Sequence, residues 1–483
     1  MLSFPQGLVS FVALGFSLTM YPAMSFHLGK PILVMVILAI ISGVVVLRRS
    51  AAPGADLTVW VFAQSHAESY RGDGTEHSRP TLVELFEQKY GRSAEVKLIQ
   101  NNALNLRLMA IMDRDVHEGE TPDLVEIEIG SIGRYFRSPL HDLGFLPLND
   151  YLENSGLINR LVEQRLMTWS KRGVIFGVPH DVHPVTITYR KDLFDEANVD
   201  LAAAKTWPDF QAKCLEAQAF WRKQGHRHRR AIELPTVAAD YLICMLLQRG
   251  INLLDDRDNI YIADPKVAQT LAFYVQCVEG PRRIAGTATP GPNVWMQDFA
   301  RGDIAAFITP DWRSGYLRLG AKSVAGKAAM MPLPRFDASD APTATWGGTM
   351  MGIPRTCPEP ELAWKLLEFL YFSPEAIRTR QRDTSILPPI RDYWNDPLYR
   401  EPDPYYGGQR VGQLFCELAE KIPIRYVTPY TGMATAMLSH VQATAVQRMR
   451  EHGPQGLEAY CQQLLDEAAA DLQRRIDFGR IEE

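Results

Sequence analysis

Two kinds of side chain stand where this chain could bind a ligand: an aromatic residue that ends an apolar run, and polar residues that follow predicted strands. Trp312 comes after the uncharged run 304–308, which is bounded by Pro310 and predicts a strand buried on both faces. Such strands are typical of mostly parallel sheets covered by helices, whose ligands gather at the carboxyl ends of the strands. We therefore interpret Trp312 as a cleft residue, with a Trp that closes the core behind the strand as the alternative.

The polar residues just beyond predicted strands supply hydrogen-bond donors and acceptors, which suit reversible binding. They are Gln64, Ser65 and His66 after the strand 57–62, and Glu128, Gly130 and Ser131 after the strand 123–127. A solvated loop carboxylate is the alternative for Glu128, and a structural histidine is the favoured interpretation of His66 and His183. The sequence has no GxSxG, HExxH or P-loop motif that would favour an enzyme.

The elements that must position these residues alternate between strand and helix. Apolar periodicity predicts strands at 57–62, 94–99 and 123–127, with helices at 81–90 and 102–112 between them. This alternation is a βαβαβ unit, and it predicts a parallel sheet. Farther along, Thr206 and Asp264 are expected to cap two helices of the second half.

Length and composition limit the possible classes of protein. A chain of 483 residues is too long for one ordinary core and predicts two or three domains. A net charge of -5 with 22% charged residues gives no basic excess for nucleic acid. The six cysteines are scattered singly, with no metal-ligand spacing, and are interpreted as small buried hydrophobic residues.

The N-terminal region predicts a membrane anchor. The run 31–47 has no polar residue except Ser42, and it ends at Arg48 and Arg49. The more dilute stretch 7–24 predicts a second span or an upstream extension. We favour an uncleaved anchor over a cleaved signal peptide. The two arginines on the domain side would, by the positive-inside rule, place the domain in the cytoplasm.

Short motifs follow one another in a fixed order from about residue 57 to about residue 475. They are TPDLV at 121–125, GVP at 177–179, YRKDLF at 189–194, TWPDF at 206–210, FARGDIAA at 299–306, MPLP at 331–334, WGG at 346–348 and AWKLLEFL at 363–370. In this order they resemble the family 1 extracellular solute-binding proteins of bacterial ABC importers, the carbohydrate-binding relatives of the maltodextrin-binding protein. The chain departs from the family pattern in its extra apolar N-terminal stretch, in lacking a lipobox, and at Ala306, where the family usually has Met.

The resemblance implies an α/β, two-lobed periplasmic-binding-protein fold of type II, with a hinge between discontinuous lobes. The expected parts are an N-terminal anchor and linker at 1–55, lobe I at 56–181 with 347–395, and lobe II at 182–346 with 396–483. The chain would cross between the lobes near 181–185, 346–351 and Trp394. A monomer is expected, with its binding domain on the periplasmic or extracellular side of the cell membrane, and this implication outweighs the charge argument above.

A carbohydrate presents an apolar C–H face and a rim of hydroxyls, so its site needs aromatic platforms beside carboxylates and amides. The resemblance places Trp312, Trp346 and Tyr430 near the cleft. Phe62 and Trp295 are weaker candidates, and Trp60 is assigned to the core. Asp181 is favoured because a crossing segment lines the cleft, and glycines there let the backbone approach a ligand or bend. The expected ligand-binding residues are Gln64, Glu128, Ser131, Asp181, Trp312, Trp346, Gly347, Gly348 and Tyr430.

The expected function is a membrane-tethered receptor that captures a carbohydrate or polyol by lobe closure and delivers it to an ABC permease, without cofactor, metal or catalytic residue. One alternative is a carbohydrate-active hydrolase, for which Glu128 and Asp181 could be the two carboxylates. Another is a ferric-ion-binding relative, suggested by Tyr405 and Tyr406, although we interpret this pair as loop packing. A third is a sensory receptor domain that shares the same site.

Overall fold

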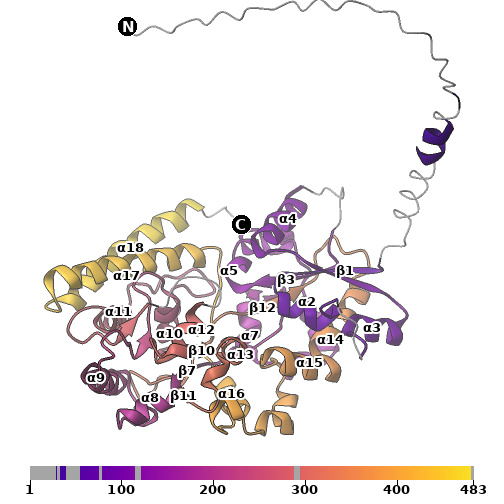
Figure 1. Cartoon of the computed structure of the whole chain (residues 1–483). Coiled ribbons are helices and arrows are strands. Elements are labelled where there is room, and N and C mark those ends of the chain that lie inside the picture. The colour runs from indigo at the N-terminus through magenta and orange to yellow at the C-terminus, as the bar shows by residue number, and fades with distance from the viewer. Residues whose placement is uncertain are drawn as a thin grey trace, which may run out of the picture. The chain divides into compact units, whose positions relative to one another are not determined.

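The computed structural model describes residues 29, 33–39, 55–74, 79–114, 121–287 and 294–479, and the chain divides into the units Met1–Gly54 and Ala55–Glu483 (Figure 1). In the first unit, residues 33–39 are helical. The rest of the predicted anchor at 31–47, and the stretch 7–24, lie outside the described residues. Among the residues described, no helix has both the length and the apolar character needed to cross a membrane.

The first sheet of the second unit contains the predicted βαβαβ unit. Its strand order is β2-β1-β3-β12-β6, with β1 at Leu57–Val61, β2 at Ala94–Leu98, β3 at Leu124–Glu128, β6 at Val178–Pro179 and β12 at Thr349–Gly352. Strand β1 runs parallel to both β2 and β3, which confirms the prediction from the alternation. Strand β12, which arrives from far along the chain, pairs antiparallel with β3 and β6.

Helices α2 (Gln64–Arg71), α3 (Leu82–Tyr90) and α4 (Asn101–Arg114) follow strands of this sheet. Local signals set the bounds of α3: Thr81 and Glu84 form a reciprocal capping box at its start, and Gly91 ends it in the left-handed conformation. Its buried residues Leu82 and Phe86 face the core of this sheet. Helices α14 (Pro360–Phe372) and α15 (Pro374–Thr384) contribute to the same core.

The second sheet has three strands in the order β10-β7-β11: β10 at Ala306–Pro310, β7 at Val185–Arg190 and β11 at Ala328–Pro332. Both neighbours pair antiparallel with β7, so the expectation of a parallel sheet around residues 304–308 was wrong. Strand β10 is buried along its whole length, as predicted, and begins two residues later than the apolar run. An uncharged run indicates that a strand is buried on both faces. It does not indicate whether the strand pairs parallel or antiparallel, because both kinds of strand can be fully buried.

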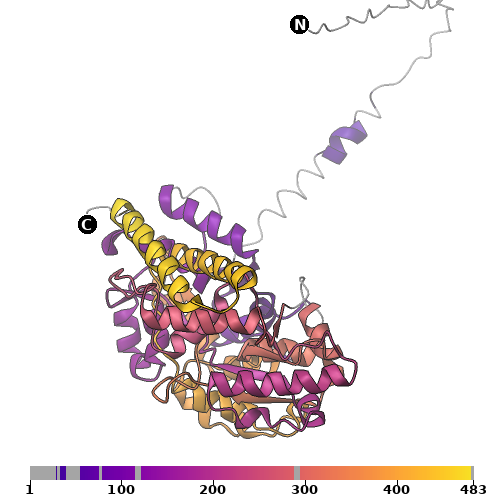
Figure 2. The same ribbon diagram turned by 90° about the vertical axis from the view of Figure 1, so that its left-hand side faces the viewer.

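Long helices cover the second sheet, and several begin at predicted caps. Thr206 caps α9 (Trp207–Lys223), and Asp264 caps α11 (Pro265–Val278), each with a proline in the first turn. Helices α17 (Thr431–His452) and α18 (Leu457–Gly479) pack against each other and against α11, which Figure 2 shows on the near side. Together with α10 (Asp240–Gln248), they enclose the largest apolar core.

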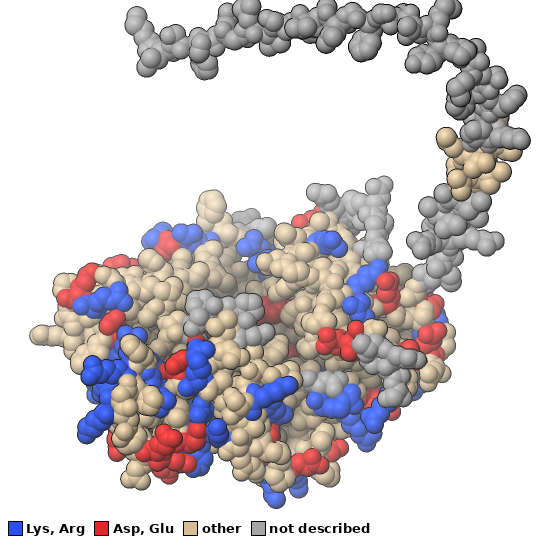
Figure 3. All heavy atoms as spheres, in the orientation of Figure 1, with Lys and Arg blue, Asp and Glu red and all other residues tan. Residues whose placement is uncertain are grey.

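The remaining helices and strands are mostly short, and the strands among them form two further two-stranded sheets, β4-β5 and β8-β9. They are α5 (Ile129–Ile132), α6 (Asn149–Asn154), α7 (Glu163–Thr168), α8 (Lys191–Glu196), α12 (Val294–Arg301), α13 (Asp311–Gly320), α16 (Val411–Ala419), β4 (Ser170–Lys171), β5 (Val174–Ile175), β8 (Ile232–Glu233) and β9 (Ala285–Gly286). On the face shown in Figure 3, basic and acidic side chains are interspersed, in keeping with the weak net charge of -5. Five of the six cysteines are buried, as expected.

The chain passes between the two sheets at separate places along its length. Residues 180–184 connect β6 of the first sheet to β7 of the second, and residues 333–348 lead from β11 back to β12. A third segment around Leu387 lies beside the first, because the Val182 amide donates to the Leu387 carbonyl at 3.1 Å. These positions agree with multiple crossings; the lobe boundaries themselves stay a prediction.

Candidate functional site

Trp312 and Trp346 lie together, although they come from different segments of the chain. Trp312 is the second residue of α13, directly after β10, and its indole nitrogen donates to the Trp346 carbonyl at 3.3 Å. The two rings meet edge to face, with centroids 5.8 Å apart and planes at 66°. Both residues are half-buried. The structure therefore brings together two predicted aromatic residues.

Arg313, which the sequence did not single out, lies behind this pair. Its guanidinium carbon is 4.2 Å from the Trp295 ring centroid and 5.6 Å from that of Trp346. The guanidinium is buried, pairs with the Glu233 carboxylate at 2.8 Å, and donates to the Tyr241 hydroxyl. The Tyr241 ring also packs edge to face on Trp346, at 4.9 Å between centroids. Arg313 thus packs against Trp346 of the aromatic pair. Trp295, a weaker candidate from the sequence, packs against the same guanidinium.

Gly347 and Gly348 follow Trp346 with φ angles of 84° and 146°, where residues other than glycine are strained. A Cβ atom on Gly347 would lie 3.2 Å from the Trp312 indole nitrogen, and one on Gly348 would lie 2.1 Å from an Arg165 guanidinium nitrogen. The Trp312 and Arg165 side chains therefore occupy the space beside Gly347 and Gly348, and this space is not open to a ligand. These glycines permit the close packing beneath the aromatic pair.

Asp181 is fully buried, and both its carboxylate oxygens have protein partners. Arg165 donates to Oδ1 at 2.6 Å, while the Thr349 amide donates to Oδ2 at 3.0 Å and His183 Nε2 lies 3.1 Å from the same oxygen. Although burial alone would raise it, the His183 and Arg165 cations hold the pKa of Asp181 well below its ordinary value. Asp181 lies in the crossing segment, as predicted, but its geometry there is that of an internal ion pair.

His183 lies between two carboxylates. Its Nδ1 is 2.6 Å from Asp311 Oδ1, on the side opposite Asp181. Burial lowers the pKa of His183, but the Asp181 and Asp311 carboxylates outweigh it and raise the pKa to about 9, so the ring is an imidazolium at neutral pH. Its interpretation as structural agrees with this geometry. Nothing in the local sequence pointed to Arg165 or Asp311 as partners, because both are distant along the chain.

Three other expected polar residues lie around the end of the first sheet. Glu128 caps α5 by accepting from the Gly130 amide at 2.8 Å, and burial raises its pKa, with Arg425 opposing that rise. The next residue, Ile129, donates its amide to the Gly348 carbonyl at 2.9 Å, which joins this end of β3 to the aromatic pair's segment. Ser131 is buried, whereas Gln64 is exposed on α2, where it donates to Glu68 at 2.6 Å.

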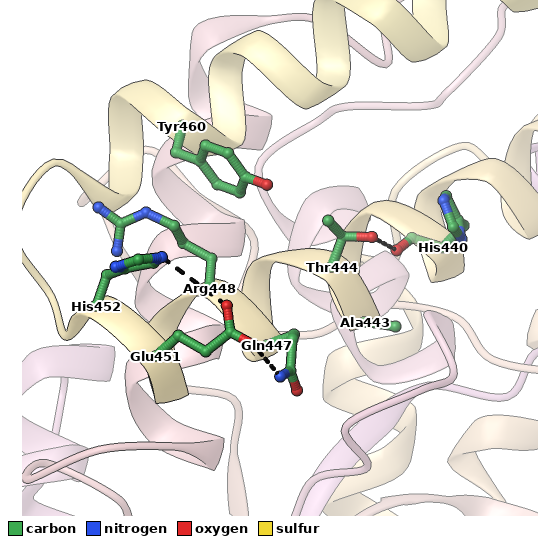
Figure 4. A pocket seen from close by; sticks show the side chains of 8 residues that line it. All are labelled: His440, Ala443, Thr444, Gln447, Arg448, Glu451, His452 and Tyr460. Carbon is green, nitrogen blue, oxygen red and sulfur yellow. Dashed lines mark hydrogen bonds and ion pairs between the residues drawn. The ribbon is translucent and has the colours of Figure 1, made fainter.

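Tyr430 lines a cavity of about 660 Å³ whose lining residues do not include Trp312 or Trp346. The lining includes Phe136, Met167 and Lys171 from one part of the chain and Arg257, Tyr426 and Met433 from another. The sequence predicted Tyr430 near the cleft, and its place in the ligand site stays a prediction. A further cavity of about 660 Å³ lies between α17 and α18, with His440, Arg448 and Tyr460 among its lining residues (Figure 4).

Tyr405 and Tyr406 are buried and packed, in agreement with the interpretation favoured from the sequence. The Tyr405 hydroxyl donates to the backbone carbonyls of Leu317 and Ala321, each at 3.1 Å. Burial raises the pKa of both tyrosines, which disfavours the phenolate that a ferric ion requires. Within the described part of the chain, no group of three or more His, Cys, Asp or Glu side chains could hold a metal ion. Trp60 is buried in the core, as expected.

Comparisons with known proteins agree with the resemblance that the sequence motifs showed. A family model described as bacterial extracellular solute-binding protein matches residues 81–402. An arabinooligosaccharide-binding protein of Halalkalibacterium halodurans is 25% identical over 342 residues, covering 69% of this chain and 74% of that protein. A lactose-binding protein of Rhizobium radiobacter is 26% identical over 311 residues, covering 62% of this chain and 69% of that protein.

Solved structures of the same architecture cover most of the chain. The sugar-binding protein MalE of Xanthomonas citri matches with a TM-score of 0.69 at 22% identity, covering 88% of this chain and 99% of that one. A binding protein from B. animalis subsp. lactis, solved with beta-1,6-galactobiose, matches with a TM-score of 0.62 at 18% identity, covering 88% and 97%. These likenesses establish the two-lobed type II fold, with mixed α and β content, for the second unit.

Proposed function

We propose that this chain, which belongs to the bacterial extracellular solute-binding proteins, captures a carbohydrate between its two lobes and delivers it to an ABC permease. The observation that carries this proposal is the half-buried pair Trp312 and Trp346, held edge to face where the chain passes between the two sheets. Partly open indole rings suit the apolar C–H face of a sugar. The names of the relatives, arabinooligosaccharide-binding and lactose-binding, support this ligand class.

The polar part of the site comes from Glu128 and from the groups that act on it. Burial raises the pKa of the Glu128 carboxylate, the charge of Asp240 adds to that rise, and the charge of Arg425 opposes it. Carboxylates and a guanidinium suit the hydroxyls of a sugar, as acceptors and donors of hydrogen bonds. Under the proposed lobe boundaries, Glu128 belongs to lobe I and the other two to lobe II. A ligand that engages both lobes would favour the closed state, and the permease would recognise that state.

We further propose that the chain acts as a monomer at the cell surface, held there by the N-terminal run 31–47, with lobe I at 56–181 and 347–395 and lobe II at 182–346 and 396–483. The uncharged run and the extracellular character of the family support the first part. The separate sheets and the connecting segments between them support the second. No step of this function requires catalysis, a metal or a cofactor.

Thermal unfolding of the full chain with a panel of carbohydrates tests the proposal. The panel contains arabino-oligosaccharides, lactose, maltodextrins, monosaccharides and polyols. A ligand at about 100 times its dissociation constant should stabilise the folded state by about 2.7 kcal/mol. The shift should disappear in Trp312→Ala and persist in Tyr261→Ala, a control that removes an exposed aromatic ring elsewhere. No shift with any carbohydrate would contradict the proposal, and turnover of an oligosaccharide would favour the hydrolase instead.

A further inference from the structure

A buried chain of four charged side chains connects the segments that pass between the two sheets. Arg165 of α7 contacts Asp181 at 2.6 Å, Asp181 contacts His183 at 3.1 Å, and His183 contacts Asp311 at 2.6 Å. Each member is less than a tenth exposed. Two cations alternate with two anions, so the charges compensate one another within this hinge network, as we name these four residues.

The hinge network holds the crossing segments to one another. Arg165 donates to the Thr345 hydroxyl at 3.1 Å, and that hydroxyl donates to the Val182 carbonyl at 3.1 Å, so the second crossing is joined to the first. Asp311 Oδ2 accepts from the Leu387 amide at 2.7 Å, which joins the third segment. Both connections between the sheets, and the segment around Leu387, therefore meet this one set of charges.

The same network reaches the aromatic pair. Asp311 is the residue before Trp312, and its Oδ1 accepts from the Trp312 amide at 2.8 Å while it contacts His183. Arg165 fills the space beside Gly348, two residues after Trp346. The two ends of the network thus lie directly against the backbones that carry the two aromatic rings. A change in the hinge angle would move these backbones unless the ion pairs break or move with them.

We propose that His183 and Asp311 are positioning residues, which couple the angle between the lobes to the placement of Trp312. This inference rests on the proposed function and adds a coupling that the aromatic pair alone does not require. His183 has a left-handed backbone, with a φ of 56°, and its two ring nitrogens contact the two carboxylates. The other charged or titratable groups facing it are Arg165, through Asp181, and His180, whose Nδ1 lies 3.7 Å from Asp181.

The test measures the distance between the lobes in the absence of any ligand. Spin labels are placed at Glu87→Cys on α3 and Glu458→Cys on α18, two exposed positions, and the distance distribution is recorded by double electron–electron resonance. His183→Asn removes the contact with both carboxylates but keeps a residue that tolerates the left-handed backbone. Asp311→Asn removes one charge with little change of shape. We expect both variants to broaden the distance distribution relative to the labelled parent.

The control is Asp192→Asn, which breaks a partly exposed ion pair to Arg190 that lies within the second sheet's half of the molecule; the two side chains are 29% and 9% exposed. It should leave the distribution unchanged even if it lowers the melting temperature. If His183→Asn or Asp311→Asn lowers the melting temperature but keeps the parent distribution, the residues are merely structural and the proposal is overturned. His183→Asn and Asp311→Asn serve as alternatives to each other if one of them fails to fold.

Titration with the carbohydrate that stabilises the parent supplies the second readout. If the binding-competent fraction falls to about a tenth, the apparent dissociation constant should rise about tenfold in both hinge variants. The control should bind like the parent. Because the distance measurement needs no ligand, the two proposals fail separately: an unchanged distribution rejects the hinge network, whereas the absence of binding by the parent rejects the carbohydrate receptor.

Discussion

The indole nitrogen of Trp312 donates to the backbone carbonyl of Trp346 at 3.3 Å, which fixes two aromatic rings from segments 34 residues apart into one unit. Both residues are half-buried. The bond makes the orientation of the Trp312 ring depend on the backbone of the segment that carries Trp346. Ligand binding should therefore depend on the integrity of this pair.

Replacing Trp312 should weaken carbohydrate binding more than it weakens folding. Trp312→Ala removes an aromatic face and the bond to Trp346, so the affinity should fall by about tenfold to a hundredfold, or about 1.4 to 2.8 kcal/mol. Trp312→Phe keeps a smaller ring and should lose less. Titration calorimetry of the three proteins gives the comparison. Equal affinities in all three would remove Trp312 from the binding site.

Gly348 should tolerate no side chain. Gly348→Ala introduces both a strained φ of 146° and a Cβ atom 2.1 Å from an Arg165 nitrogen that the buried Asp181 holds in place. The matched control is Gly408→Ala, where φ is 86° and nothing lies within 4 Å. The control isolates the backbone strain, on the order of 1 to 3 kcal/mol. Urea unfolding should show a larger loss in Gly348→Ala, and equal losses would mean that Arg165 moves aside without cost.

Breaking the ion pair between Arg313 and Glu233 should lower the free energy of unfolding substantially. Arg313→Met leaves the Glu233 carboxylate, whose side chain is 12% exposed, without its cation, and such a loss is expected to cost about 3 to 5 kcal/mol. Arg160→Met is the matched control, because the side chains of Arg160 and its partner Asp392 are 43% and 48% exposed and such pairs contribute about 1 kcal/mol or less. Denaturant unfolding of both variants makes the comparison. A small loss in Arg313→Met would show that water reaches Glu233.

The stability of the protein should fall as the pH rises through about 9, the pKa of His183. The folded-state pKa is raised above the ordinary value of 6.5, so the stabilising contribution is complete below pH 6.5 and is lost as the ring deprotonates near pH 9. The contribution is on the order of a few kcal/mol. Unfolding free energies from pH 6 to 10 should therefore fall more steeply in the parent than in His183→Asn. Parallel curves would contradict an imidazolium between Asp181 and Asp311.

Local patterns in the sequence predicted much of the fold. The alternation of short apolar runs gave the parallel arrangement of β1, β2 and β3, and Thr206 and Asp264 cap helices as expected. These features depend on neighbouring residues, whose spacing is visible in one sequence. The direction of β10 was predicted wrongly because full burial is compatible with either direction of pairing.

The candidate site was harder to predict because its partners are far apart in the chain. Asp181 was correctly placed in a crossing segment, but its cation, Arg165, donates from a helix with no local signal of that role. Asp311 and Arg313 flank Trp312, yet their contacts with His183 and Glu233 arise only from the fold. Tyr430 was expected near the cleft, and it lines a cavity whose lining residues do not include Trp312. A single sequence shows residue types near strand ends, and it does not show which of them meet.

Calorimetric titration of the full chain with arabino-oligosaccharides, lactose and maltodextrins tests most directly whether this protein is a carbohydrate receptor built on the aromatic pair. We predict saturable binding of one carbohydrate per chain, without turnover, that Trp312→Ala weakens and Tyr261→Ala leaves unchanged. The absence of binding by every carbohydrate, or binding that Trp312→Ala leaves intact, would contradict the account.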